Sequence, residues 1–280
     1  MESVKKTTKK AARTHAKVAH PHGTLIIIGG KEDKSGEMKI LKEIARRLEN
    51  GKLVIITAAS EIPSEVWNDY EKVFKKLKVH NLEHLHVNQP DDVEKVNLEK
   101  VFHNAKGIFF TGGDQLKLTS KLGGTVVMDY IIEVFRAGGV LAGTSAGAAV
   151  MGETMLVGGE NGESHKVGNW MMAPGLRFVE NMIIDQHFAQ RGRIGRLLGA
   201  VALNPGILGI GIDEGTAIVI EENKFKILGD NAVYVLDGRE VTYTNISEAS
   251  ADQTMSIHDV KLHVLSEPEV FDLKARTALT

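Results

Sequence analysis

Residues 138–151 read GGVLAGTSAGAAVM, a short apolar run that leads into small helix-forming residues. The run ends in Gly143-Thr144-Ser145-Ala146-Gly147, which has the G-x-S-x-G form of a nucleophile elbow. In such an elbow the chain turns from strand to helix so tightly that small residues must flank the serine, whose oxygen rises above the sheet edge. Ser145 would then lie near a helix N-terminus, where free N–H groups can bind a developing negative charge. The alternative interpretation is a glycine-rich packing turn that contains an ordinary serine.

Strands and helices are expected to alternate on the N-terminal side of this turn. Four apolar, β-rich runs, each followed by a loop and then by apolar residues at helical spacing, occupy residues 24–28, 53–57, 82–87 and 107–110. Continuous apolar runs are typical of strands that are buried on both faces of a parallel sheet. We therefore expect an α/β fold with a doubly wound, mainly parallel sheet. After Thr216, short β-rich runs between turn residues predict a small antiparallel extension near the C-terminus.

Glycines and polar residues follow three of the expected strands. Gly29-Gly30 follows the first, Gly112-Gly113 the fourth and Ser145 the fifth. Because the carboxyl ends of parallel strands share one sheet edge, we expect these residues to lie together. Gly112-Gly113 would let main-chain N–H groups approach a substrate oxygen, or would simply make a tight turn. A nucleotide site at Gly29-Gly30 is disfavoured, because neither G-x-G-x-x-G nor a P-loop is present.

A base for the serine is expected at His187. It ends the apolar run 183–187, and the pKa of a histidine suits proton transfer near neutrality. Arg191, Arg193 and Arg196 follow closely and cannot all share one helical face. Some of them should therefore face a site, where guanidinium groups can hold carboxylates. The alternative is a basic surface helix that pairs with acids.

The acid that would orient this histidine is expected at Asp213 or Glu214. Both follow another apolar run, 209–212, and the sequence does not choose between them. A carboxylate at that place would fix the histidine tautomer and stabilise the imidazolium. The alternative is a β-turn with two solvated acids.

Composition excludes several classes of protein. The chain has 280 residues, 42% of them hydrophobic and 25% charged, with a formal net charge of -2 and no cysteine. These values favour a globular protein with no nucleic-acid or membrane partner, and they rule out disulfides and cysteine nucleophiles. Residues 1–22 form a basic stretch without the apolar centre of a signal peptide, and we expect a disordered tail followed by one domain over 23–280. No spacing of histidines and carboxylates calls for a metal.

Five blocks of the sequence, taken together and in order, resemble the cyanophycinases, serine peptidases that are related to aspartyl dipeptidase. The resemblance extends over roughly residues 23–236. The blocks are Gly29-Gly30-Lys31-Glu32-Asp33, Thr111-Gly112-Gly113-Asp114-Gln115, Gly143-Thr144-Ser145-Ala146-Gly147-Ala148, Asp185-Gln186-His187-Phe188 with the three arginines, and Asp213-Glu214-Gly215-Thr216-Ala217.

This resemblance implies a class I glutamine-amidotransferase-like (flavodoxin-like) fold and an exopeptidase that needs no cofactor. The implied substrate is cyanophycin, a polyaspartate whose side-chain carboxyls carry arginine, which such enzymes cut into β-aspartyl-arginine dipeptides through an acyl-enzyme. A cytoplasmic location and a homodimer are also implied. The competing interpretations are an α-aspartyl or isoaspartyl dipeptidase on the same fold and a non-catalytic binding protein.

Carried over by position, the resemblance implies that Ser145 is the nucleophile, His187 the base and Glu214 the acid, with Glu160 and Glu163 as the remaining choices for the acid. Gly113 and Ala146 are our choice of backbone oxyanion donors. The positions that match the substrate pocket are Gln115, Asp185, Gln186, Arg191, Arg193 and Arg196.

Overall fold

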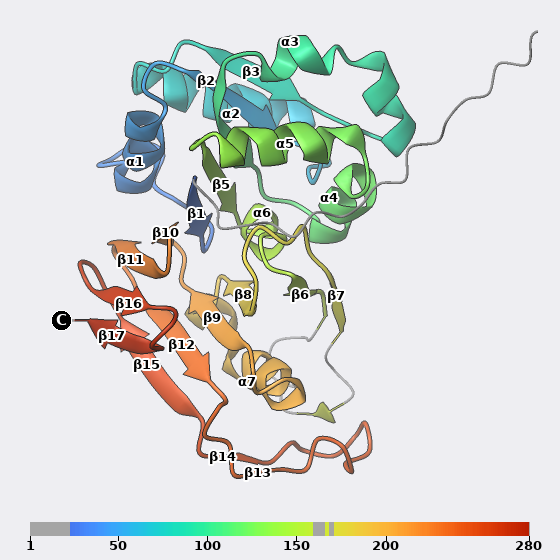
Figure 1. Cartoon of the computed structure of the whole chain (residues 1–280), viewed down its shortest axis with the longest axis vertical. Coiled ribbons are helices and arrows are strands. Elements are labelled where there is room, and N and C mark those ends of the chain that lie inside the picture. The colour runs from blue at the N-terminus through green and yellow to red at the C-terminus, as the bar shows by residue number, and fades with distance from the viewer. Residues whose placement is uncertain (1–22, 159–165, 168–170, 280) are drawn as a thin grey trace, which may run out of the picture.

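The computed structural model describes residues 23–158, 166–167 and 171–279. The expected basic tail, residues 1–22, and the two alternative acids, Glu160 and Glu163, lie outside these ranges. Figure 1 shows the strands and helices of the N-terminal half in the upper part of the view and the later strands below them.

A nine-stranded sheet with the order β17-β16-β11-β10-β1-β5-β4-β2-β3 forms the centre of the molecule. Its parallel part consists of β1 (Thr24–Ile28), β5 (Val140–Thr144), β4 (Ala105–Phe110), β2 (Lys52–Ile56) and β3 (Leu82–Leu85). The antiparallel part consists of β10 (Thr216–Glu221), β11 (Lys224–Gly229), β16 (Val270–Asp272) and β17 (Thr277–Leu279). The parallel sheet and the later antiparallel extension are both as predicted.

Helices cover both faces of the parallel strands. The helices are α1 (Lys39–Arg47), α2 (Pro63–Lys76), α3 (Leu98–Phe102), α4 (Gln115–Leu122), α5 (Val126–Arg136) and α6 (Ala146–Ala149), with a 3₁₀ segment η1 (Pro90–Lys95) before α3. In β1, Ile26 and Ile28 pack with α1 and α2, whereas Leu25 and Ile27 pack in the larger core with α3, α4, α5 and α6. Alternate residues of one strand thus enter two cores, and because both faces are apolar the strand reads as a continuous hydrophobic run.

A second sheet, which the sequence did not predict, contains four of the later strands. Its order is β15-β12-β9-β8, with β8 (Met182–Gln186), β9 (Leu208–Ile212), β12 (Val233–Asp237) and β15 (Lys261–Leu265). Helix α7 (Ile194–Leu203) packs against it through a small core of its own. Two short pairs, β6 (Thr154–Leu156) with β7 (Met172–Pro174) and β13 (Tyr243–Thr244) with β14 (Ile257–His258), complete the strands.

The turn from β5 into α6 has the geometry of a strained elbow. Ser145 has φ 54° and ψ −113°, a conformation that costs energy for any residue with a side chain. The two glycines of the motif allow the chain to pack this closely: a Cβ at Gly143 would lie 2.3 Å from the carbonyl oxygen of Gly147, and one at Gly147 would lie 2.3 Å from that of Phe110. The motif is therefore a tight packing turn that also displays its serine.

The close approach at Gly147 makes this turn sensitive to one methyl group. We expect Gly147→Ala to lower the free energy of unfolding by about 1–3 kcal/mol, because the backbone of β4 cannot move away from the new Cβ. Thermal unfolding measures this as a fall of about 2–4 °C per kcal/mol for a chain of this size. Gly206→Ala is the control, since its Cβ would meet only the Asn204 side chain, at 3.4 Å. Equal stability of the two variants would contradict the packing described here.

Candidate active site

Ser145, His187 and Glu214 form one hydrogen-bonded chain. Ser145 Oγ lies 2.9 Å from His187 Nε2, and His187 Nδ1 lies 2.7 Å from Glu214 Oε1. The three residues follow β5, β8 and β9, so two sheets contribute to one cluster. Ser145 is half-buried and His187 is only 6% exposed. A hydroxyl, an imidazole and a carboxylate in this arrangement can pass a proton from the serine to the histidine.

The loop after β1 holds these three segments together. The carbonyl of Ile28 accepts the N–H of Ser145 at 3.2 Å, that of Gly29 accepts the N–H of His187 at 2.8 Å, and that of Gly30 accepts the N–H of Gly215 at 2.8 Å. Gly30 has φ 103°, and a Cβ there would lie 2.3 Å from the imidazole of His187. Gly29-Gly30 therefore gives close backbone contact with the histidine.

Only one of the two adjacent acids reaches the histidine. Glu214 contacts His187 through one oxygen and Lys31 Nζ, at 3.0 Å, through the other. Its own N–H donates to Gln190 Oε1 at 3.2 Å. Asp213 instead accepts the N–H of Ala189 at 2.8 Å and so fixes the turn after His187. The sequence left the choice between Asp213 and Glu214 open, and the geometry favours Glu214.

The surroundings of the histidine favour its neutral form. Burial lowers the pKa of His187 below its ordinary value, the bond to Glu214 opposes this, and the charges of Arg191 and Arg193 add to the lowering. Burial raises the pKa of Glu214, but the hydrogen bonds of Lys31 and His187 outweigh it, so this pKa is lowered overall. At neutral pH the pair is therefore a neutral imidazole beside a carboxylate, the state that can accept a proton.

Most of the residues expected to line the substrate pocket bond to one another. Asp185, buried at the end of β8, forms ion pairs with Arg196 and, at 3.2 Å, with Arg193. Arg193 Nη1 also donates to the side chain of Gln186 at 3.0 Å, while its buried Nε has no partner among the described residues. Burial lowers the pKa of Arg193 to about 10, so it stays cationic at neutral pH. This cluster joins β8 to α7 and carries a net positive charge.

The two remaining pocket candidates differ in their surroundings. Arg191, in the 3₁₀ segment η3 (Ala189–Arg191), is exposed. Gln115, at the start of α4, donates its side-chain N–H to the carbonyl of Leu156. Arg191 is thus the arginine of the three that is free to face solvent or substrate.

Backbone donors lie close to the serine. Ala146 is the first residue of α6, so its N–H has no acceptor within the helix. A Cβ placed on Gly112 would lie 3.4 Å from the Cβ of Ser145. Gly113 has φ 140°, and a Cβ placed there would point instead at the carbonyl of Ala59. The segment after β4 therefore brings main-chain groups to the serine.

A pocket of about 270 Å³ opens beside Ser145. Its other lining residues are Lys31, Glu32, Lys34, Val66, Tyr70, Gly112 and Thr144. Glu32 and Tyr70 were not singled out from the sequence. Glu32 stood in a block that matched the family, which is a usable signal, but Tyr70 looked like an ordinary apolar residue on its helix.

The described ranges contain neither a cluster of metal-ligating side chains nor a membrane-spanning helix. Within them, no group of three or more histidines and carboxylates is placed to hold a metal ion. Nor do they contain a helix with the length and apolar character that a bilayer crossing requires.

Comparison with known proteins places the chain in a family. Residues 25–228 match the peptidase family S51. A cyanophycinase from Nostoc sp. is 39% identical over 259 residues, which cover 91% of this chain and 87% of that protein. A cyanophycinase from Geminocystis herdmanii is 35% identical, covering 90% of this chain and 94% of its own length.

The chain belongs to peptidase family S51. As an S51 peptidase it is a hydrolase. A crystal structure of a peptidase from an acI-B1 Actinobacterium shares its fold, with a TM-score of 0.68, 23% identity, and coverage of 90% of this chain and 98% of that one. The family match and the two relatives confirm the resemblance of the sequence to the cyanophycinases.

The positive charge of Arg191 should lower the pKa of His187 in this peptidase, and an NMR titration can measure the effect. NMR should place the pKa of His187 below that of a free histidine, and Arg191→Gln should raise it, because a nearby positive charge is removed. Peptidase activity needs the neutral imidazole. As the solution is acidified, Arg191→Gln should therefore lose activity at a higher pH than the parent protein does. Arg177→Gln, a substitution of an arginine that pairs with Glu153, is the control. An unchanged His187 titration in Arg191→Gln would refute the electrostatic account.

Proposed function

We propose that this S51 peptidase is a serine-type exopeptidase that hydrolyses cyanophycin and releases β-aspartyl-arginine dipeptides. The observation that carries the proposal is the chain from Ser145 through His187 to Glu214, with contacts of 2.9 and 2.7 Å, in a protein whose relatives include cyanophycinases. The relatives indicate the substrate, and the geometry supports a mechanism for cleaving it.

The proposed reaction begins with proton transfer from Ser145 to Nε2 of His187. The serine oxygen attacks the carbonyl carbon between successive aspartates, and Glu214 stabilises the imidazolium that forms. His187 then gives its proton to the leaving amine, which leaves an acyl-enzyme on Ser145. Water attacks this ester with His187 again as base, which restores the serine and frees the product acid.

The oxyanion formed in both steps needs main-chain donors. We assign this role to the N–H groups of Ala146 and Gly113, supported by the position of Ala146 at the start of α6 and by the approach of the 112–113 segment to the serine. A single donor of this kind contributes roughly 10²- to 10³-fold to the rate.

The polymer carries carboxylates, and the positive charge near the site suits them. We assign substrate carboxylate binding to exposed Arg191, with Arg193 and Arg196 supplying a fixed positive field from their cluster with Asp185. Gln115 and Gln186 complete the proposed lining. Three finer parts of the proposal rest on the family resemblance: a glutamine-amidotransferase-like (flavodoxin-like) fold, a homodimer and a cytoplasmic location.

Removing the serine hydroxyl tests the reaction. Ser145→Ala should abolish release of β-aspartyl-arginine from purified cyanophycin, because no nucleophile remains. Its thermal midpoint should stay near that of the parent protein, since the elbow keeps a small side chain. Chromatography of the released dipeptide measures the activity, and an active Ser145→Ala would remove Ser145 from the mechanism. Isoaspartyl and α-aspartyl dipeptides, assayed in parallel, would reveal a dipeptidase instead.

Neutralising the acid tests the role of Glu214. Glu214→Gln should reduce kcat by on the order of 10²- to 10⁴-fold, because the amide neither fixes the tautomer of His187 nor stabilises its charged form. Asp213→Asn is the matched control, as Asp213 bonds backbone N–H groups rather than the histidine. A small loss in Glu214→Gln with a large loss in Glu160→Gln or Glu163→Gln would transfer the role to that residue.

A further inference from the structure

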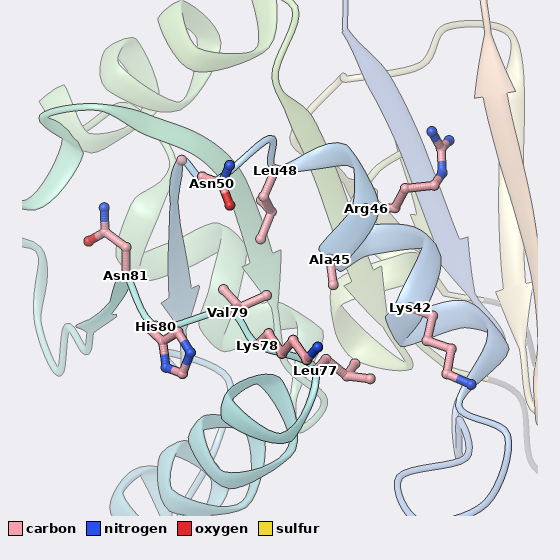
Figure 2. A pocket seen from close by; sticks show the side chains of 11 residues that line it. Lys42, Ala45, Arg46, Leu48, Asn50, Leu77, Lys78, Val79, His80 and Asn81 are labelled. Atoms are coloured by element: carbon pink, nitrogen blue, oxygen red, sulfur yellow. The ribbon is translucent and has the colours of Figure 1, made fainter.

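A second pocket lies remote from Ser145. It encloses about 480 Å³ between the C-terminal ends of α1 and α2, and several basic residues line it. Figure 2 shows the side chains of Lys42 and Arg46 extending to the side opposite His80 and Asn81. Arg46 is also paired with Glu43 at 2.8 Å. The positive groups that line this pocket do not point toward a common centre, so the pocket shows no arrangement that identifies a ligand.

The pocket beside Ser145 differs, because a buried acid lines it. We infer that this pocket binds the guanidinium group of a substrate arginine, with Glu32 as its ion-pair partner and the ring of Tyr70 as its stacking surface. The inference rests on the proposed function and deepens it. It assigns Glu32 and Tyr70 to substrate specificity, a role separate from the Ser145–His187–Glu214 chain.

Glu32 is a buried acid without a cation. It is 5% exposed, and it accepts hydrogen bonds from the hydroxyls of Tyr70 and, at 2.6 Å, of Thr144. Both donors are neutral, and the described part of the chain gives Glu32 no ion pair. Buried carboxylates are normally paired, and each can accept about four hydrogen bonds. Glu32 can therefore accept further hydrogen bonds, and it lines the same pocket as the nucleophile Ser145.

Tyr70 keeps this acid in place and offers a surface to a cation. Burial and the neighbouring Glu32 raise the pKa of Tyr70 well above its ordinary value, so its hydroxyl remains a donor. The ammonium of Lys34 already lies 4.0 Å from the centre of the ring. A cation thus lies over the ring surface that we assign to the substrate guanidinium. A planar guanidinium stacks on a ring and binds a carboxylate through two bonds, so it should displace the ammonium.

The other acids that the structure describes near the site already have partners. Asp185 forms ion pairs with Arg193 and Arg196, so it has little to offer a substrate cation. Lys31, at the mouth of the pocket, is neutralised by Glu214 at 3.0 Å. Among the described residues, Glu32 is therefore the acid beside the nucleophile that remains for a substrate guanidinium. The pocket walled by α2 takes the positive group, while exposed Arg191 takes the carboxylates.

Two synthetic substrates separate this role from a structural one. One is a tri-aspartate whose side-chain carboxyls carry arginine, and the other carries citrulline, the neutral analogue of arginine with nearly the same shape. For Glu32→Gln we expect KM for the arginine substrate to rise about 10- to 100-fold, while kcat/KM for the citrulline substrate changes less than about threefold. The preference of the enzyme for arginine should largely disappear.

Lys34→Ala supplies a second and opposite test. Removing the competing ammonium should lower KM for the arginine substrate by about two- to fivefold. Lys42→Ala is the matched control, because Lys42 lines the remote pocket. A rise in KM for Lys34→Ala would mean that Lys34 itself binds the substrate, and would overturn the inference.

The remaining outcomes are also distinct. Equal losses on both substrates in Glu32→Gln would show that Glu32 only holds Thr144 and the elbow, and would refute the specificity role. Should Glu32→Gln fail to fold, the parent enzyme decides: arginine amide should inhibit competitively at a concentration at least about tenfold below citrulline amide, and equal inhibition overturns the inference. If the parent enzyme cleaves neither substrate nor cyanophycin, the proposed function itself fails.

Discussion

Three successive carbonyl groups at the end of β1 hold the reactive residues in register. Ile28, Gly29 and Gly30 each accept one N–H, from Ser145, His187 and Gly215 in turn. The elbow belongs to the central sheet, whereas the histidine and the acid come from the ends of β8 and β9 in the second sheet. Backbone hydrogen bonds to one short loop therefore fix distances that side-chain packing alone would leave adjustable. Neither glycine tolerates a side chain, because His187 and Asp213 lie directly against them.

Nearby contacts compensate both the strained backbone of Ser145 and the buried charge of Asp185. The positive φ of Ser145 is held by its bond to Ile28 and by close packing of Gly143 and Gly147. The buried charge of Asp185 is met by two arginines, which fixes β8 against α7 next to His187. Breaking a buried pair of this kind is costly because it leaves an uncompensated charge. The Asp185 cluster therefore contributes to the site by positioning the histidine as well as by its field.

The sequence predicted those parts of the fold that depend on local pattern. Runs such as 24–28 and 140–144 are apolar on both faces, which only a covered parallel strand requires, and the elbow is a local turn. The second sheet was missed because an apolar run such as 208–212 reveals that it is buried but not which strands pair with it. Asp213 and Glu214 could not be separated because adjacent residues point in different directions, and only the position of His187 shows which one reaches it. Tyr70 was missed because its hydroxyl matters only beside Glu32, 38 positions earlier.

The arrangement of charge around Ser145 follows from what each acid already binds. Glu214 is shared between His187 and Lys31, and Asp185 is shared between two arginines, so both are neutralised within the protein. Within the described part of the chain, Glu32 is bonded only to hydroxyls, which orient a carboxylate without cancelling its charge. An enzyme that handles only carboxylate-bearing peptides would gain nothing from keeping such a charge buried beside its nucleophile. A substrate in which carboxylates and guanidinium groups occur together would gain from it, because Glu32 then meets the guanidinium group while Arg191 meets a carboxylate.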